Sequence, residues 1–312
     1  LLLRFPGRGY HATPWGHHVN EGMIEWPPSP WRLLRALLAT GYATHDWGGN
    51  LADPMASSPP SSARSLIKKL AAVLPRYRLP QASGAHSRHF MPTAVLDKGR
   101  EKTTLVFDTF AQVECGVVAV TWDITLNTAE ADCLAMLAQD LGYLGRSESW
   151  VQAQVADASI ALPDRDDCVP CTNRPHPSGG WEQVSLLAMT SEADFTAWRS
   201  RMVEQALAPY PLLDQASSKK NQQSEKRLQE RAKAEAPFPK DLIACLQTDT
   251  TWLRGHGWSQ PPGTQRVLYW RKSDSIAPGT HVAPRIPRAE SASHILLSLA
   301  SPTHNTHVLP LR

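Results

Sequence analysis

Apolar residues recur at helical spacing between residues 29 and 41, where the chain reads "SPWRLLRALLATG". Ser29 suits the N-cap and Pro30 the first helical position, so we predict a helix that begins at Pro30 and ends at Gly41. The positions that define its apolar face are Trp31, Leu34, Leu37 and Leu38. A short apolar run at residues 1–5 predicts a strand before this helix.

The apolar period then alternates between helical and strand spacing up to about residue 156. Pro75 closes an amphipathic helix, and Thr128 suits the N-cap of another that ends near Gly142 and Gly145. β-Branched and aromatic runs predict strands between these two helices. The predicted elements are a helix at 62–75, an extended basic segment at 76–92, strands at 103–114 and 117–126, a helix at 128–145 and a strand at 148–156.

The order of these elements predicts a fold. Residues 1–160 are expected to form strand, helix, second helix, strand, strand, helix and strand. Without the second helix this is the β-α-β-β-α-β order of a ferredoxin-like domain, which is the fold of RNA-recognition modules. We therefore predict an α+β protein in which residues 1–160 form one ferredoxin-like domain.

The second half has a less regular pattern and predicts a helical, loop-rich extension of the same domain over residues 161–290. Ser191 and Asp194 have the spacing of a capping box at the start of a predicted helix. The extension is expected to contain a polar loop at 164–180, a helix at 191–207, a highly charged helix at 217–236 and a strand at 265–271. A run at 293–301 predicts another strand with nothing after it to close it, so we expect a further domain to follow.

Charge is distributed unevenly along the chain, although the formal net charge is only +3. Residues 64–102 hold nine Lys or Arg against two Asp or Glu, whereas residues 103–198 hold three against fourteen. A local basic excess is typical of a phosphate-binding surface, and a solvated face explains it equally well. No apolar run reaches the roughly 18 residues of a membrane span. Five cysteines without a regular framework suit a reducing cytoplasm.

The sequence offers only fragments of a metal site. Cys168 and Cys171 stand two residues apart and His176 follows, but Trp181 occupies the position where a fourth zinc ligand is needed. The histidine-rich stretch "RGYHATPWGHH" at residues 8–18 has no accompanying cysteine pair or His-Glu-x-x-His motif. We therefore predict no metal and no cofactor.

Nucleophilic and nucleotide-binding motifs are also missing from the sequence. Acid–base catalysis by histidine alone, as in metal-independent ribonucleases, remains open because it needs only one or two imidazoles near a 2′-hydroxyl. His86 and His89 in "HSRHF" are the best candidates for it.

Single-stranded RNA binding fits two other features better. Residues 8–18 and 76–90 both interleave Arg and His with aromatic residues. Guanidinium and imidazole groups contact phosphates, and aromatic faces stack on unpaired bases. Any one of these aromatic side chains can also serve as packing, and we expect this of Trp15.

Several long blocks of the sequence resemble one protein family. They are "RGYHATPWGHHVNEG", "EWPPSPWRLLRALLAT", "HSRHFMP" followed by "LVFDTF", "LGYLGRSESWV" and "WLRGHGWSQPPGTQRVLYW". Together they are similar to the Csb-two family of type I-G CRISPR systems, in which a Cas-five-like subunit is fused to a Cas-six-like endoribonuclease. Both halves of that family belong to the RAMP superfamily of ferredoxin-like RNA binders.

The resemblance implies a function and a set of partners. This chain would bind the 5′ handle of crRNA, cap a filament of Cascade backbone subunits, meet the large subunit and contact target DNA near the PAM. A β-hairpin thumb would arise from the basic segment before "LVFDTF". Residues 291–312 would begin a truncated Cas-six-like domain, so no catalytic residue is assigned in this chain.

The candidate RNA contacts come from three regions: the first loop and helix, the thumb segment, and the "GRSESW" turn. They are Arg8, His11, His17, Arg32, Arg35, Arg76, Arg78, His86, Arg88, His89, Arg146 and Trp150. Two alternatives remain: a metal-independent repeat endoribonuclease within this chain, and a non-enzymatic scaffold whose basic faces meet acidic proteins.

Overall fold

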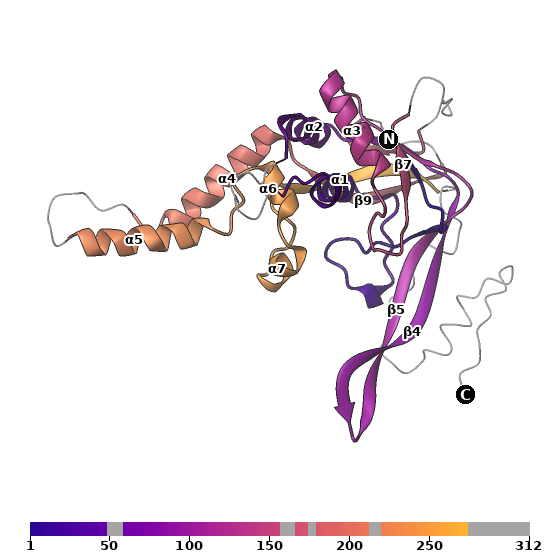
Figure 1. Ribbon diagram of the computed structural model, residues 1–312, viewed down its shortest axis with the longest axis horizontal. Helices are drawn as coiled ribbons and strands as arrows, with labels where there is room; N and C mark the ends of the chain where they lie inside the picture. Colours follow the sequence, from indigo (N-terminus) through magenta and orange to yellow (C-terminus); the bar gives the residue numbers. More distant parts are fainter. Residues whose placement is uncertain (49–58, 157–165, 174–178, 212–219, 274–312) are drawn as a thin grey trace.

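The structure of the 312-residue chain is a computed structural model that describes residues 1–48, 59–156, 166–173, 179–211 and 220–273. It contains two antiparallel sheets and several helices, and it is therefore an α+β protein as predicted (Figure 1). A body of sheet and helices carries two projections, a long β-hairpin and a helical arm.

The larger sheet has seven strands, and every neighbouring pair in it is antiparallel. In spatial order the strands are β7 (Gln152–Gln154), β1 (Leu2–Arg4), β6 (Val118–Thr121), β3 (Arg76–Arg78), β8 (Cys168–Pro170), β10 (Thr264–Lys272) and β9 (Trp181–Met189). Its first four strands come from the first half of the chain. The other three come from the second half, so β8, β9 and β10 continue the same sheet.

Helix α1 (Pro30–Thr44) begins as its sequence predicts, with the Ser29 hydroxyl accepting from the backbone N–H of Arg32. The predicted apolar face is buried in full, because Trp31, Leu34, Leu37 and Leu38 are at most 4% exposed. The predicted end at Gly41 is wrong, since the helix continues for three more residues. A Cβ at Gly41 would collide with the ring of Trp47, so this glycine serves close packing and does not end the helix.

Helices α2 (Ser61–Ala72) and α3 (Thr128–Gln139) pack beside α1. The N-cap of α3 is Asn127, one residue before the predicted Thr128, and it forms a capping box with Glu130. Lys69 and Ser65 of α2 donate to the Glu130 carboxylate, and these hydrogen bonds lower its pKa to about 2. The buried carboxylate therefore joins the two helices.

A second sheet projects from the body as a long hairpin (Figure 1). Strands β4 (Ala82–Asp97) and β5 (Arg100–Val113) form the hairpin, and β2 (Gly9–Tyr10) pairs with β5 at its base. The predicted basic segment at 76–92 is thus divided: its first residues form β3 of the larger sheet, and the rest, from Ala82 onward, forms the first strand of the β-hairpin that the resemblance implied. Two 3₁₀ turns, Val19–Glu21 and Cys171–Asn173, lie elsewhere in the loops.

The helical arm consists mainly of α4 (Glu192–Leu207) and α5 (Lys220–Glu235) (Figure 1). The Ser191 hydroxyl caps α4 by accepting from the backbone N–H of Asp194, as predicted. Two short helices, α6 (Leu242–Gln247) and α7 (Thr250–Gly255), lead back to the sheet. His176, the predicted strand at 293–301 and the segment 291–312 lie outside the described residues.

Candidate nucleic-acid interface

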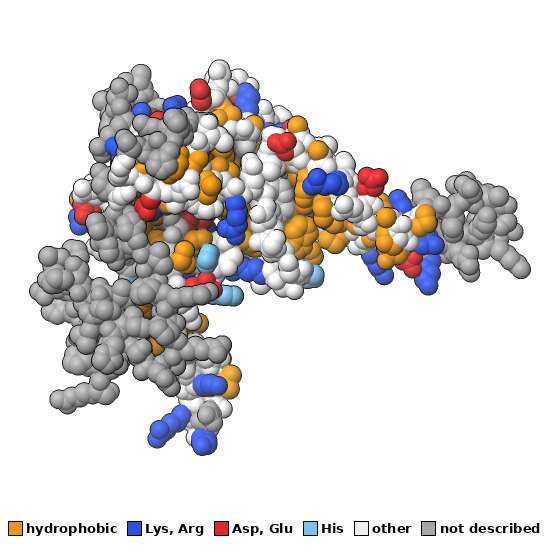
Figure 2. Space-filling model, turned by 180° about the vertical axis from the view of Figure 1, so that it is seen from behind, with side chains coloured by type: hydrophobic (Ala, Val, Ile, Leu, Met, Phe, Trp, Pro, Cys, Tyr) orange, Lys and Arg blue, Asp and Glu red, His pale blue; other side chains and the backbone are white. Residues whose placement is uncertain are grey.

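A pocket of about 360 Å³ opens where the hairpin joins the body. Three separate parts of the chain line it: the loop around β2, the facing strands β4 and β5, and the turn before β7. The lining residues are Gly7, Gly9, His11, Ser87, His89, Asp108, Phe110, Glu148 and Ser149. In Figure 2 histidine and acidic side chains lie together at the junction between the hairpin and the body.

The turn at residues 145–149 holds the histidine of the first loop in place. The backbone N–H of His11 donates to the Ser149 hydroxyl at 2.8 Å, and the backbone N–H of Arg146 donates to the His11 carbonyl at 3.0 Å. Gly145 has a φ of +91°, and a Cβ there would lie 2.5 Å from the His11 carbonyl oxygen. Only glycine therefore allows this turn to approach the loop so closely.

Replacing Gly145 with Ala is expected to destabilise the protein by about 1–3 kcal/mol, because both the backbone conformation and the close approach to His11 become unfavourable. Urea denaturation measures this change. Gly142→Ala is the matched control because nothing lies within 4 Å of a Cβ there and no positive φ is required. Equal stability of the two variants would contradict the importance of this contact.

His11 is the most enclosed titratable group of the pocket. Its side chain is 7% exposed, and its Nδ1 lies 2.6 Å from Oε1 of Glu148. Its Nε2 is buried and has no hydrogen-bond partner among the described residues. Burial lowers the pKa of His11, and the nearby positive charge of Arg146 lowers it further. The carboxylates of Glu148 and Asp108 act in the opposite direction but do not outweigh these two effects. A carboxylate can only accept, so in its neutral form the ring donates from Nδ1 to Glu148 and leaves Nε2 as an acceptor.

The carboxylate of Asp108 connects three other groups of the pocket. Arg146 donates to its Oδ1 at 3.1 Å, and His11 Nε2 lies 3.7 Å from the same oxygen. His89 Nε2 lies 3.9 Å from Oδ2. Asp108 therefore sits between two imidazoles and a guanidinium, with its side chain only 10% exposed.

The structure thus brings together three of the predicted residues, His11, His89 and Arg146. It also adds Asp108, Glu148 and Ser149, which the sequence analysis did not select. Asp108 lies in the block "LVFDTF" and Glu148 in the block "GRSESW", so a carboxylate within a block that also resembles the family was the signal in the sequence. Spacing alone could not show that these blocks meet.

The strand pairing separates the predicted hairpin residues. His89 pairs with Val106 and Ser87 with Asp108, so these positions point to the pocket side. His86 pairs with Thr109 and Arg88 with Phe107, which places them on the opposite face. His86 packs against Phe107, with ring centroids 5.0 Å apart, and burial lowers the pKa of His86.

The far half of the hairpin exposes both apolar and basic side chains. Large apolar residues there are 50–74% exposed, and Lys and Arg side chains gather at the end of the hairpin in Figure 2. The apolar residues are Phe90, Met91, Val95 and Leu96, and the basic ones are Lys98, Arg100 and Lys102. An exposed strand pair of this composition is typical of a surface that binds another molecule.

Two predicted arginines of α1 take part in internal contacts. Arg32 forms a bidentate pair with Glu25, which is 5% exposed, and it also donates to the Thr13 carbonyl. Arg35 donates to the Thr248 carbonyl and lies over the Trp31 ring. We therefore assign both arginines structural roles.

The remaining predicted residues lie apart from the pocket lining. Arg76 and Arg78 of β3 lie 3.5 and 3.9 Å from the carboxylate of Asp166. His17 pairs with Glu21 at 2.7 Å, and exposed Arg8 donates to the sulfur of Cys115. Trp150 is 65% exposed and forms a bridge with Tyr143, which is also exposed. Residues joined by an antiparallel bridge project from the same side, so these two aromatic rings form an exposed pair.

Trp15 packs, as the sequence predicted. It is 5% exposed, meets Trp31 edge to face, and donates from Nε1 to the Ser259 carbonyl. Arg254 lies over its ring at 4.9 Å. The loop at residues 8–18 is thus attached to the second half of the chain through its tryptophan.

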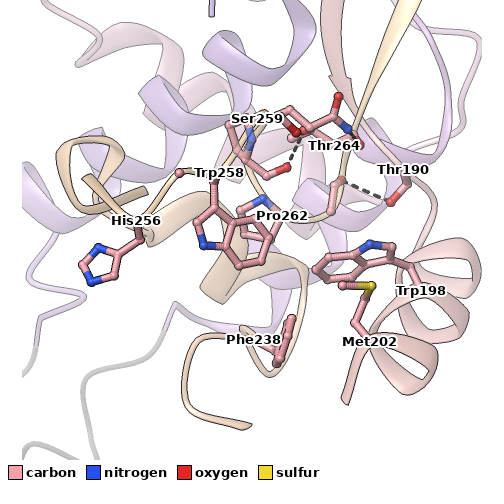
Figure 3. Close-up of a pocket in the computed structure, with 13 residues that line it drawn as sticks. Thr190, Trp198, Met202, Phe238, His256, Trp258, Ser259, Pro262 and Thr264 are labelled. Atoms are coloured by element: carbon pink, nitrogen blue, oxygen red, sulfur yellow. Dashed lines mark hydrogen bonds between the residues drawn. The ribbon is translucent and has the colours of Figure 1, made fainter. Parts of the chain in front are cut away.

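A second pocket, of about 540 Å³, lies between the arm and the body (Figure 3). Trp198 of α4, Phe238 and Trp258 contribute aromatic rings whose centroids lie 6.1–6.4 Å apart in pairs. In Figure 3 the His256 side chain points away from these rings. The rings contact one another, so they attach the arm to the loop that precedes β10.

Among the residues that the structure describes, no three His, Cys, Asp or Glu side chains are placed to hold a metal ion. None of the described helices is both long and apolar enough to cross a membrane. Comparison of the chain with protein-family models, curated proteins and solved structures gives no match.

Proposed function

We propose that this chain binds single-stranded RNA and holds the 5′ handle of crRNA in a CRISPR effector complex, as its resemblance to the Csb-two family implies. Backbone subunits, a large subunit and target DNA are the partners that this proposal includes, and a cytoplasmic location goes with it. The observation that carries the proposal is the long hairpin with an exposed basic and apolar end, which projects from the sheet between β3 and β6.

The strand order supports a ferredoxin-like core for this proposal. Along the chain, β1, α1, β3, β6, α3 and β7 follow the β-α-β-β-α-β order once α2 is set aside. In space these strands lie in the order β7-β1-β6-β3, so each helix connects two strands that have a third strand between them. The hairpin replaces the short turn that would join β3 to β6.

The chemistry of the hairpin also supports RNA as the ligand. Basic side chains neutralise phosphates, and exposed apolar or aromatic side chains contact unstacked bases. Met91 and Phe90 project from opposite faces of the hairpin because they are adjacent in β4. A strand of RNA could therefore meet base-contacting groups on either face.

An endoribonuclease within this chain has weaker support. His86 and His89 lie on opposite faces of the hairpin, so they cannot act together on one phosphodiester from those positions. The scaffold alternative is separated from RNA binding by the absorbance spectrum of the purified protein, because copurified nucleic acid favours RNA binding.

The proposal predicts that RNA affinity falls as salt rises, with a slope of about −0.7 on logarithmic axes for each phosphate neutralised. Fluorescence anisotropy with a labelled single-stranded RNA, repeated over a series of salt concentrations, measures this slope. Duplex RNA of the same sequence is the control and should bind less tightly, since its bases are not available for stacking. A flat salt dependence would overturn the proposal.

A further inference from the structure

The pocket at the base of the hairpin is rich in hydrogen-bond acceptors. His11 Nε2 is buried and has no hydrogen-bond partner within the described parts of the chain, and the carboxylate of Asp108 lies 3.7 Å from it. Glu148 contributes a second carboxylate, 56% exposed, on the other side of the imidazole. The hydroxyls of Ser87 and Ser149 also line the pocket. A ligand that fits here must therefore present several donors.

This chemistry disfavours a phosphate in the pocket. Asp108 and Glu148 bring two negative charges, and Arg146 already donates to Asp108. A phosphate carries acceptors only, so it would meet like charge at close range. The RNA backbone is better accommodated by the basic groups farther along the hairpin.

The walls of the pocket favour a flat ligand. Gly7 and Gly9 leave one side without side chains, and Phe110 presents an aromatic ring on β5. The His11 and Phe110 rings are tilted to each other, with centroids 6.3 Å apart. Such walls admit a planar ring that stacks while its edge reaches the acceptors.

We propose that this pocket reads one unpaired guanine of the bound RNA through the N1–H and N2 amino donors of its Watson–Crick edge. Guanine presents two adjacent donor groups on that edge, whereas adenine and cytosine present one amino group and uracil one imino group between carbonyls. Acceptors from Asp108, His11 and Glu148 match the two donor groups, and Phe110 offers a stacking surface. This inference rests on the proposed RNA-binding function and adds base selectivity to it.

The test uses the full chain and short uridine-rich RNAs that carry one central guanosine, inosine, adenosine, cytidine or uridine. Inosine lacks only the N2 amino group of guanosine. We expect the RNA with guanosine to bind about tenfold more tightly than the RNA with inosine, because a well-placed base contact contributes about 1–3 kcal/mol. Its preference over the RNAs with adenosine, cytidine and uridine should be at least as large. Anisotropy at constant salt measures the five affinities.

Glu148→Gln is the decisive variant because this half-exposed side chain keeps its size but exchanges an acceptor oxygen for a donor amide. We expect the preference for guanosine over inosine to fall below about twofold. Glu101→Gln, which changes an exposed carboxylate at the far end of the same hairpin, is the matched control and should keep the preference.

The outcomes separate the two proposals. Salt-dependent binding of all five RNAs with equal affinity overturns the guanine pocket and leaves the proposed function standing. No binding of any RNA overturns the proposed function itself. If arginine amide displaces the RNA from the wild-type protein but not from Glu148→Gln, the pocket is a cation site. If the protein cleaves the RNA and His11→Gln abolishes the cleavage, the pocket is a catalytic site. Either result overturns the assignment as a base-binding pocket.

Discussion

Replacing Lys98, Arg100 and Lys102 together with glutamine is expected to weaken single-stranded RNA binding by about a hundredfold at about 0.1 M salt. These three side chains are exposed at the end of the hairpin, where they can reach phosphates. If each side chain neutralises one phosphate, the variant releases fewer counterions on binding. The plot of log affinity against log salt concentration should then become less steep by about 2, which corresponds to the same hundredfold loss at about 0.1 M salt. Anisotropy titrations over a salt series measure both quantities.

The matched control removes equal charge from the helical arm. Lys226, Lys233 and Lys240 are also exposed, so their replacement with glutamine changes the net charge by the same amount. We expect that control to change RNA affinity by less than about threefold, because charges beyond a Debye length are screened. Equal losses in the two triple variants would mean that net charge alone attracts RNA, and the hairpin would lose its assigned role.

Glu25→Gln is expected to lower the free energy of unfolding by about 3–5 kcal/mol, because it leaves the partly buried Arg32 without its charged partner. Glu25 is 5% exposed and accepts hydrogen bonds from the Tyr10 hydroxyl at 2.8 Å and the Ser29 backbone N–H at 3.0 Å. Arg32 adds a bidentate pair from α1. This carboxylate thus joins the first loop to the start of the first helix, and urea denaturation at neutral pH measures its contribution.

The same carboxylate predicts a pH dependence with a defined direction. Burial alone would raise the pKa of Glu25, but the charge and hydrogen bonds of Arg32 outweigh it and hold the pKa below its ordinary value of about 4.5. The stabilisation is therefore complete above about pH 4.5 and is lost as the pH falls through the lower, folded-state pKa. Glu25→Gln should flatten this part of the stability profile.

Glu101→Gln is the control for both measurements. An exposed carboxylate at the end of the hairpin should change the free energy of unfolding by less than about 0.5 kcal/mol. A Glu25→Gln protein as stable as this control, with an unchanged acid transition, would show that the Glu25–Arg32 pair contributes nothing to the fold.

Local patterns predicted the elements that depend on local contacts. The face of α1 and the caps at Ser29 and Ser191 follow from spacing within a few residues, and the structure confirms them. The ends of α2 and α3 were predicted three and six residues too late, at Pro75 and Gly145, since these helices end at Ala72 and Gln139. Two other errors at helix ends have tertiary or neighbouring causes. Gly41 remains helical because Trp47 packs against it, and Asn127 takes the N-cap because its side chain completes the capping box one residue earlier.

The sequence predicted only part of the candidate site, and the reason is physical. His11, His89 and Arg146 were selected by residue type, but they came from a list in which Arg32 and Arg35 had the same appearance. Those two arginines sit on an α1 face that meets Glu25 and Thr248, so internal partners take their donors. A basic residue's type states what it can bind, and its surroundings decide what it does bind.

By itself the sequence determined the α+β character, the first helix and its buried face, the packing of Trp15 and the basic character of the hairpin segment. Only the tertiary structure decided that residues 8–18 meet the turn at 145–149. His11 and Glu148 are 137 positions apart, and their 2.6 Å contact depends on β2 pairing with β5 and on the tight turn at Gly145. The spacing of residues along the chain predicts helices and strands, because these depend on local periodicity. It does not predict a contact such as this one, which arises from the packing of strands and turns that are distant in sequence.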